Sequence, residues 1–108
     1  MSKRRAPVPS RVAQALAKLG SDLKNARRRR RVPMAYAAYC AGISRSTLHK
    51  VECGDPGVSL GMLASVLSGY GMVERLERLV DARWDSTGLA LEEDGMPRRI
   101  RGRSSRPA

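Results

Sequence analysis

Basic and hydroxyl-bearing side chains gather in the segment that follows Gly42. They are Arg45, Ser46, Thr47, His49 and Lys50. Guanidinium and ammonium groups suit the O6 and N7 atoms of guanine, so Arg45 and Lys50 are candidates for base contacts, whereas the hydroxyl of Ser46 can pair with several base edges. Thr47 is better placed for a phosphate, and His49 shares the exposed face. The simpler alternative for every one of them is a solvated polar face on a small helix.

Five adjacent arginines, Arg27 to Arg31, form a second candidate binding feature. Like charges at this density repel one another unless an anion lies near, so a nucleic-acid partner explains the run better than solubility alone. Arg28, Arg30 and Arg31 are the members expected to bind DNA. The formal net charge of +11 agrees with a polyanionic partner. Basic residues dominate positions 1–31 and 98–108, whereas residues 73–97 are acidic.

The other reactive residues form no catalytic or metal-binding pattern. His49 and Cys53 lie four positions apart on one helix face, but two ligands do not make a zinc site and the sequence offers no second pair. With a single histidine and no phosphate-cradling glycine loop, we expect no enzyme activity, no metal and no cofactor. No apolar run approaches the ~18–20 residues of a membrane span, so no membrane partner is expected.

Apolar spacing and capping residues place the helices that would hold these side chains. The first is expected from Ser10 to about Arg30, with a bend or restart at Gly20–Ser21. The second spans about 33–41, because proline suits a first helical turn, and the recognition helix spans about 44–53, because Ser44 is a good N-cap. With Gly42 between them, the two helices predict a helix-turn-helix.

Two further helices complete an expected domain over residues 10–84. One follows Ser59, with an apolar stripe of Leu60, Leu63, Ala64, Leu67 and Tyr70. The last spans about 73–84, and its apolar face would either finish the monomer core or form a dimer interface; that face comprises Leu76, Leu79, Val80 and Trp84. Residues 1–9 are expected to be a flexible basic arm, and residues 85–108 an Arg-rich tail that is disordered or binds a partner.

Residues 19–71, about half of the chain, resemble the lambda repressor/Cro-like (Xre) helix-turn-helix family. The matching positions are Leu23, Arg27, Ala38, the turn from Gly42 to Leu48, Glu52, Gly54, Ser59, Leu60 and Leu67. The resemblance implies an all-α, compact five-helix lambda-repressor-like domain with flexible basic N- and C-terminal tails. It also implies that Glu52 reaches back to Arg27 as a structural pair. The chain departs from the family at Pro33 and Met34, which replace a Ser/Thr cap and a Gln that contact the phosphate backbone.

The segments 54–81 and 88–101 resemble the HipB-type branch, antitoxin-repressors that pair with HipA-like kinases. The function implied is a sequence-specific transcriptional repressor that binds double-stranded DNA as a homodimer, autoregulates its operon and restrains a HipA-like kinase toxin. Its expected location is the bacterial cytoplasm, on the nucleoid when bound to DNA; two cysteines and the absence of a signal peptide fit a reducing compartment. The alternatives are a phage-type or stand-alone regulator without a toxin, a mainly protein-binding toxin-neutralising module, and a nonspecific nucleic-acid binder.

Overall fold

The computed structural model of this protein describes residues 7–95. Most of the expected arm, residues 1–6, and the tail from residue 96 to 108 lie outside that range. Every regular element within residues 7–95 is helical, as expected for an all-α chain. These residues form two compact units that divide after Leu76, well before the expected domain boundary after Trp84. No helix in the described range is long and apolar enough to cross a bilayer.

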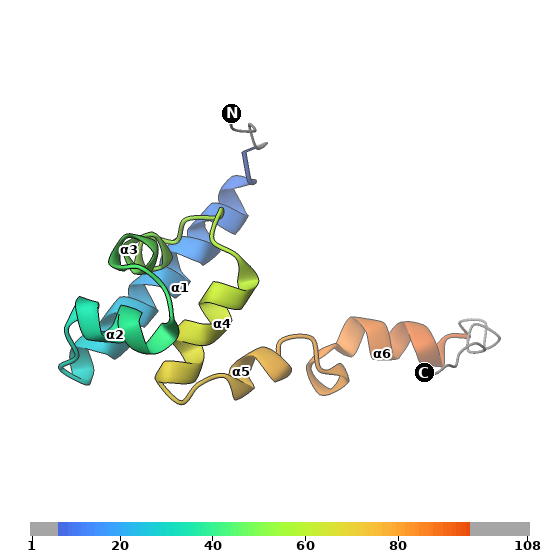
Figure 1. The fold of residues 1–108 in the computed structure, drawn as a ribbon. Coiled ribbons are helices and arrows are strands. Elements are labelled where there is room, and N and C mark those ends of the chain that lie inside the picture. Colours follow the sequence, from blue (N-terminus) through green and yellow to red (C-terminus); the bar gives the residue numbers. More distant parts are fainter. Residues whose placement is uncertain (1–6, 96–108) are drawn as a thin grey trace. The chain divides into compact units, whose positions relative to one another are not determined.

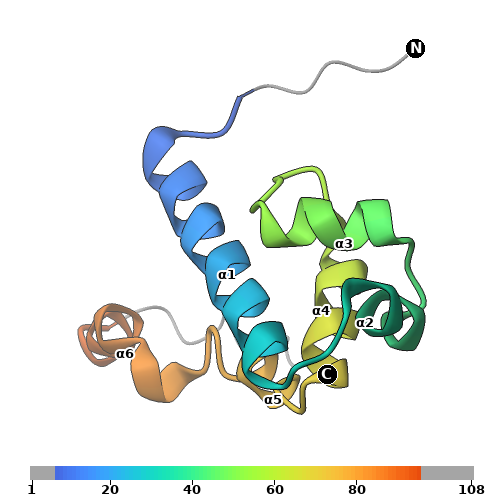
Figure 2. The same ribbon diagram turned by 90° about the vertical axis from the view of Figure 1, so that its left-hand side faces the viewer.

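The first unit is built from four main helices. They are α1 (Ser10–Arg29), α2 (Met34–Ala41), α3 (Arg45–Glu52) and α4 (Leu60–Gly69). α1 packs against α3, and α2 packs against both α3 and α4 (Figures 1 and 2). Leu48 of α3 is completely buried, and the buried apolar residues around it come from all four helices: Leu23, Ala37, Ala38, Val51, Val66 and Leu67. This unit therefore has a single hydrophobic core.

α1 runs without interruption through Gly20, where a bend or restart was expected. Gly20 is buried, and a Cβ atom on it would lie 2.7 Å from the carbonyl oxygen of Glu52 and 2.8 Å from that of Val51. The glycine serves the close approach of α1 to the end of α3 rather than a break in the helix. α1 begins at Ser10, but its N-cap is Pro9 and no side chain caps it.

α4 is capped as expected, because Ser59 Oγ accepts a hydrogen bond from the amide of Met62 at 3.0 Å. The expected apolar stripe is wrong at two positions. Leu60 is 68% exposed, whereas Val66, which the stripe omitted, is buried. α4 packs against α2, and the buried residues of α4 are Val66 and Leu67.

The single helix expected over residues 73–84 is wrong. α5 is one short turn (Glu74–Glu77), and a 3-10 helix, η1, follows at Ala82–Trp84. Leu76 packs against the core of the first unit. The apolar residues beyond it are left exposed: Leu79 by 69%, Val80 by 86% and Trp84 by 73%. Because helices in proteins are stabilised mainly by burying an apolar face, a helix without such burial has little to hold it together.

Aspartates organise the second unit instead. Asp81 Oδ1 accepts a hydrogen bond from the amide of Arg83 at 2.9 Å, and Asp85 Oδ1 accepts one from the amide of Gly88 at 3.0 Å. The second of these bonds caps α6 (Ser86–Glu93). Part of the segment expected to be a disordered or partner-binding tail is therefore helical, because a side-chain cap stabilises its first turn.

Candidate nucleic-acid interface

The turn between α2 and α3 determines where the polar helix begins. Gly42 ends α2 in the left-handed conformation, with φ of 71°. Ser44 Oγ then accepts a hydrogen bond from the amide of Thr47 and donates one to its hydroxyl, each 3.0 Å long. The expected N-cap is therefore present. The Thr47 hydroxyl already has a partner, and its side chain is half-buried, so it is less free to bind a phosphate than its neighbours on α3.

α3 presents a polar face and buries the opposite one. Its buried residues are Leu48, Val51 and Glu52. The exposed residues fall at positions that share one face of a helix, and they are Arg45, Ser46, His49 and Lys50. All five side chains expected on the recognition helix thus lie on α3, and four of them share its exposed face.

His49 also contacts a cysteine at the end of the same helix. Its Nε2 lies 3.5 Å from Cys53 Sγ, and both residues are exposed. Within residues 7–95, no three His, Cys, Asp or Glu side chains come together in a group that could hold a metal ion.

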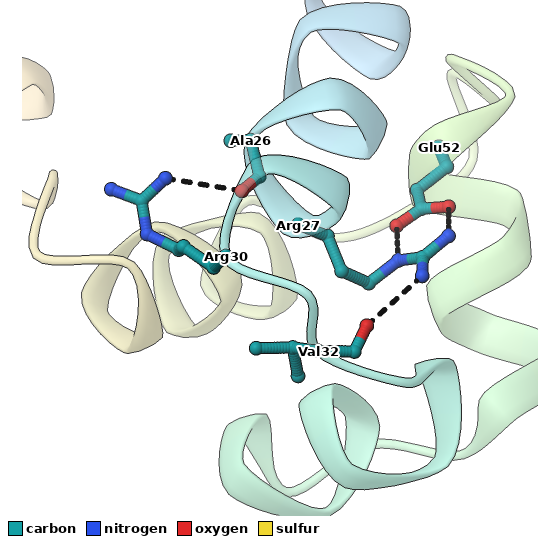
Figure 3. Close-up of polar contacts among 5 residues, drawn as sticks. All are labelled: Ala26, Arg27, Arg30, Val32 and Glu52. Atoms are coloured by element: carbon teal, nitrogen blue, oxygen red, sulfur yellow. Dashed lines mark hydrogen bonds and ion pairs between the residues drawn. The ribbon is translucent and has the colours of Figure 1, made fainter.

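The expected structural pair locks α3 onto α1. Arg27 Nε donates to Glu52 Oε2 at 2.7 Å, and Arg27 Nη2 donates to Glu52 Oε1 at 3.1 Å (Figure 3). A third bond runs from Arg27 Nη1 to the carbonyl oxygen of Val32 at 3.1 Å. The two side chains are only 10% and 5% exposed, and the hydrogen bond that Arg27 donates to Glu52 raises the pKa of Arg27 although burial opposes the shift. One guanidinium therefore joins α1, α3 and the segment before α2.

Arg30, which was expected to bind DNA, makes structural contacts of its own while remaining exposed. Its Nη1 donates to the carbonyl of Ala26 at 3.1 Å and its Nη2 to the carbonyl of Tyr70 at 3.2 Å. The guanidinium also lies 5.5 Å from the centre of the Tyr70 ring. Figure 3 shows Arg27 and Arg30 leaving α1 in opposite directions. No signal in the sequence pairs Arg30 with a residue so distant along the chain.

The Tyr70 ring lies against the Arg30 guanidinium, and its hydroxyl is in an unusual environment. Its hydroxyl is buried and has no hydrogen-bond partner within the described part of the chain. Burial is the main cause that raises its pKa, and Glu52 adds to the shift, whereas Arg27 and Arg30 oppose it. The ring thus sits close to the polar network that supports α3.

The remaining arginines of the run are available to a partner. Arg28, Arg29 and Arg31 are exposed, and none of them contributes a side chain to the hydrogen bonds and ion pairs of residues 7–95. Arg29 lines an open groove of about 310 Å³ with Leu19 and Leu67. The five arginines therefore divide into two, Arg27 and Arg30, whose side chains hydrogen-bond within the unit and three whose side chains form no such bond within residues 7–95.

α2 begins at Met34, so Pro33 precedes the helix and does not lie in its first turn as expected. Pro33 is the N-cap and makes no side-chain hydrogen bond, and Met34 is partly buried against the core. Neither side chain can donate a hydrogen bond to a phosphate. Any backbone contact at this corner must come from neighbouring residues.

The described parts of the two units differ in net charge. Residues 7–76 carry eleven Lys and Arg against four acidic residues, whereas residues 77–95 carry two Arg against six acidic residues. The exposed basic groups of α3 and of the arginine run belong to the first unit, and within residues 7–95 the excess of positive charge lies there. No family model, curated protein or solved structure matches this chain.

Proposed function

We propose that this chain is a sequence-specific DNA-binding protein of the helix-turn-helix type. α2 and α3 form the motif, and α3 is the recognition helix that enters the major groove. The observation that carries the proposal is the exposed face of α3, which presents Arg45, Ser46, His49 and Lys50 from a helix fixed to α1 by the buried Arg27–Glu52 pair. A rigid helix holds such side chains in register with base edges.

The residues of α3 and of the arginine run take different roles. Arg45 and Lys50 donate to guanine O6 and N7, and Ser46 reads an adjacent base edge. Arg28 and Arg31 bind phosphates beside the motif in place of the polar residues that Pro33 and Met34 lack. Arg30 is assigned to the support of the fold, because two carbonyl groups and the Tyr70 ring already engage it.

The resemblance to the lambda repressor/Cro-like family supports a lambda-repressor-like fold for residues 7–76 and a role as a transcriptional repressor. One recognition helix buries little DNA surface, so binding as a homodimer to a two-fold operator is part of the proposal. Within this role we place the chain in the HipB-type branch, as an antitoxin that restrains a HipA-like kinase toxin and represses its own operon.

The test is a comparison of cognate and scrambled duplexes, after selection of the cognate from a random pool. Arg45→Ala and Lys50→Ala should each weaken binding to the cognate by about 1–3 kcal/mol and have smaller effects on the scrambled duplex. Lys18→Ala is the control, since Lys18 is an exposed cation on α1 that pairs with Asp22. Equal losses on both duplexes would show that the α3 side chains touch phosphates only, which contradicts base recognition.

A second candidate, a module whose main task is binding another protein, is favoured by the second unit. Its exposed Leu79, Val80 and Trp84 accompany an excess of acidic residues over positions 77–95, a combination that suits a protein partner. Val80→Ser/Trp84→Ser tests this role. A variant that keeps DNA affinity and self-association but no longer inhibits a kinase encoded beside the gene supports the module. A variant that retains inhibition contradicts it.

A further inference from the structure

Four helices of the first unit end in the same hydrogen-bonding pattern. In each, an amide just beyond the helix bonds to a carbonyl five positions earlier, and the amide before it bonds to a carbonyl three positions earlier. The outer bonds are Val32 to Arg27, Ile43 to Ala38, Asp55 to Lys50 and Met72 to Leu67. This is the Schellman motif, which places the residue between the two amides in the left-handed conformation.

Three of the four motifs use glycine at that position and one does not. Gly42, Gly54 and Gly71 have φ of 71°, 75° and 73°. The motif that ends α1 uses Arg31, with φ of 55°, which is the one positive φ of a non-glycine residue within residues 7–95. A left-handed conformation is unfavourable for an L-residue with a long side chain, so α1 ends in a strained residue where glycine would not be strained.

No contact of the Arg31 side chain within residues 7–95 offsets this strain. The Arg31 side chain is exposed and takes part in none of the hydrogen bonds or ion pairs of the described residues. Its neighbours hold the backbone in place instead: Arg30 is fixed on Tyr70, and the carbonyl of Val32 is bonded to Arg27. Residues held in unfavourable conformations by their surroundings cluster at ligand-binding sites.

We propose that Arg31 is kept in this left-handed position to bind a phosphate of the DNA backbone, and that the first unit loses stability as a result. The inference rests on the proposed DNA-binding function. Arg31 lies in the connection between α1 and α2 that the Arg27–Glu52 pair ties to the recognition helix. A phosphate contact here fixes the height and angle at which α3 meets the groove, which is how backbone contacts position a reading helix.

Thermal unfolding of the full chain tests the strain. Arg31→Gln removes the charge and keeps a side chain at the left-handed position, whereas Arg31→Gly removes both the charge and the strain. The Tm of Arg31→Gly should exceed that of Arg31→Gln by roughly 4–8 °C. The difference between these two variants excludes the relief of repulsion among the arginines, because both variants have lost the same charge.

Binding to a random-sequence duplex over a series of salt concentrations tests the contact. The logarithm of the binding constant falls linearly with the logarithm of the salt concentration, and loss of one phosphate contact should reduce the magnitude of this slope by about 0.9. The same loss should weaken binding about eightfold at ~0.1 M salt. Arg31→Gly and Arg31→Gln should both show this loss, and Arg31→Lys should keep the slope. Lys18→Gln is the matched control with unchanged slope, because Lys18 is an exposed cation of α1 that already pairs with Asp22.

The outcomes separate this inference from the function on which it rests. Equal Tm values for Arg31→Gly and Arg31→Gln overturn the inference, because no strain is then released. An Arg31→Gly protein that binds DNA with the wild-type slope also overturns it and leaves the proposed function standing. A wild-type protein that binds no duplex overturns the proposed function and this inference together.

Discussion

A Cβ atom on Gly20 would lie 2.7 Å from the carbonyl oxygen of Glu52, so the backbones of α1 and α3 are nearly in contact. Glu52 thus meets α1 at two levels, through its carbonyl at Gly20 and through its carboxylate at Arg27. The first contact depends on the absence of a side chain and the second on a pair of buried charges. Together they set the position of the proposed recognition helix.

Gly20→Ala should lower the free energy of unfolding by about 2–3 kcal/mol, because the added methyl group meets backbone atoms that cannot rotate away. Urea unfolding of the full chain measures the change. Gly69→Ala is the matched control, since Gly69 is also helical but no atom lies within 4 Å of its Cβ position. That variant should be neutral or more stable by up to about 1 kcal/mol. Similar losses in both variants would contradict the close approach of α1 to α3.

Glu52→Ala should destabilise the first unit by about 3–5 kcal/mol, because it leaves the buried Arg27 guanidinium without its anion. Asp22→Ala breaks the Lys18–Asp22 pair, whose side chains are 75% and 55% exposed, and should cost under about 1 kcal/mol. Urea unfolding at low and moderate salt compares the two. If Glu52→Ala were no worse than Asp22→Ala, the ion pair would not hold α3 to α1. The double variant Arg27→Met/Glu52→Leu should recover much of the loss, because no buried charge remains.

Ser44→Ala should cost about 1 kcal/mol of stability, because the amide of Thr47 loses its capping acceptor. Ser46→Ala is the control, since Ser46 is exposed on the same helix and caps nothing. In DNA binding the ranking should reverse, with Ser46→Ala weakening binding to the cognate duplex more than Ser44→Ala does. Equal stability of the two variants would show that the cap contributes little.

Tyr70→Phe should be neutral or stabilising near pH 7, because the buried hydroxyl has no hydrogen-bond partner in the described structure. Burial raises the pKa of Tyr70 in the folded state above its ordinary value near 10. The folded protein therefore holds this proton more tightly than the unfolded chain. The stability that comes from this tighter proton binding is fully present below about pH 10, and it is lost as the pH rises through the folded-state pKa of Tyr70.

The free energy of unfolding, followed from pH 8 to pH 11, checks this prediction. The wild-type protein should lose stability more steeply above about pH 10 than Tyr70→Phe does. Tyr39→Phe is the matched control, because it removes the hydroxyl of a tyrosine that is 79% exposed. Parallel curves for wild type and Tyr70→Phe would show that the hydroxyl is not shielded from water.

Local features were predictable wherever a residue acts through its near neighbours. Ser44 and Ser59 cap the helices that they precede, and Gly42 adopts the left-handed conformation that a tight turn requires. The two faces of α3 follow from its apolar spacing, since Leu48 and Val51 are buried and Arg45 and Lys50 are exposed. The partnership of Arg27 with Glu52 came from the resemblance to a known family, because spacing alone does not join residues that lie on different helices.

Features that depend on residues far apart in the chain were decided by tertiary packing and could not be predicted from local sequence. Gly20 read as a helix breaker from its neighbours, yet it is the contact point between α1 and the end of α3. Arg28 and Arg30 look alike in the sequence, but the position of Tyr70 engages only the second. Residues 73–84 have the spacing of an amphipathic helix, but an apolar face stabilises a helix only when another surface covers it, and Leu79, Val80 and Trp84 are left exposed. The sequence by itself determined the Ser44 and Ser59 caps, the turn and the two faces of α3, because those depend on hydrogen bonds and spacing within a few residues. Only the fold decided which arginines are engaged and which apolar faces are buried, because burial depends on what the rest of the chain brings alongside.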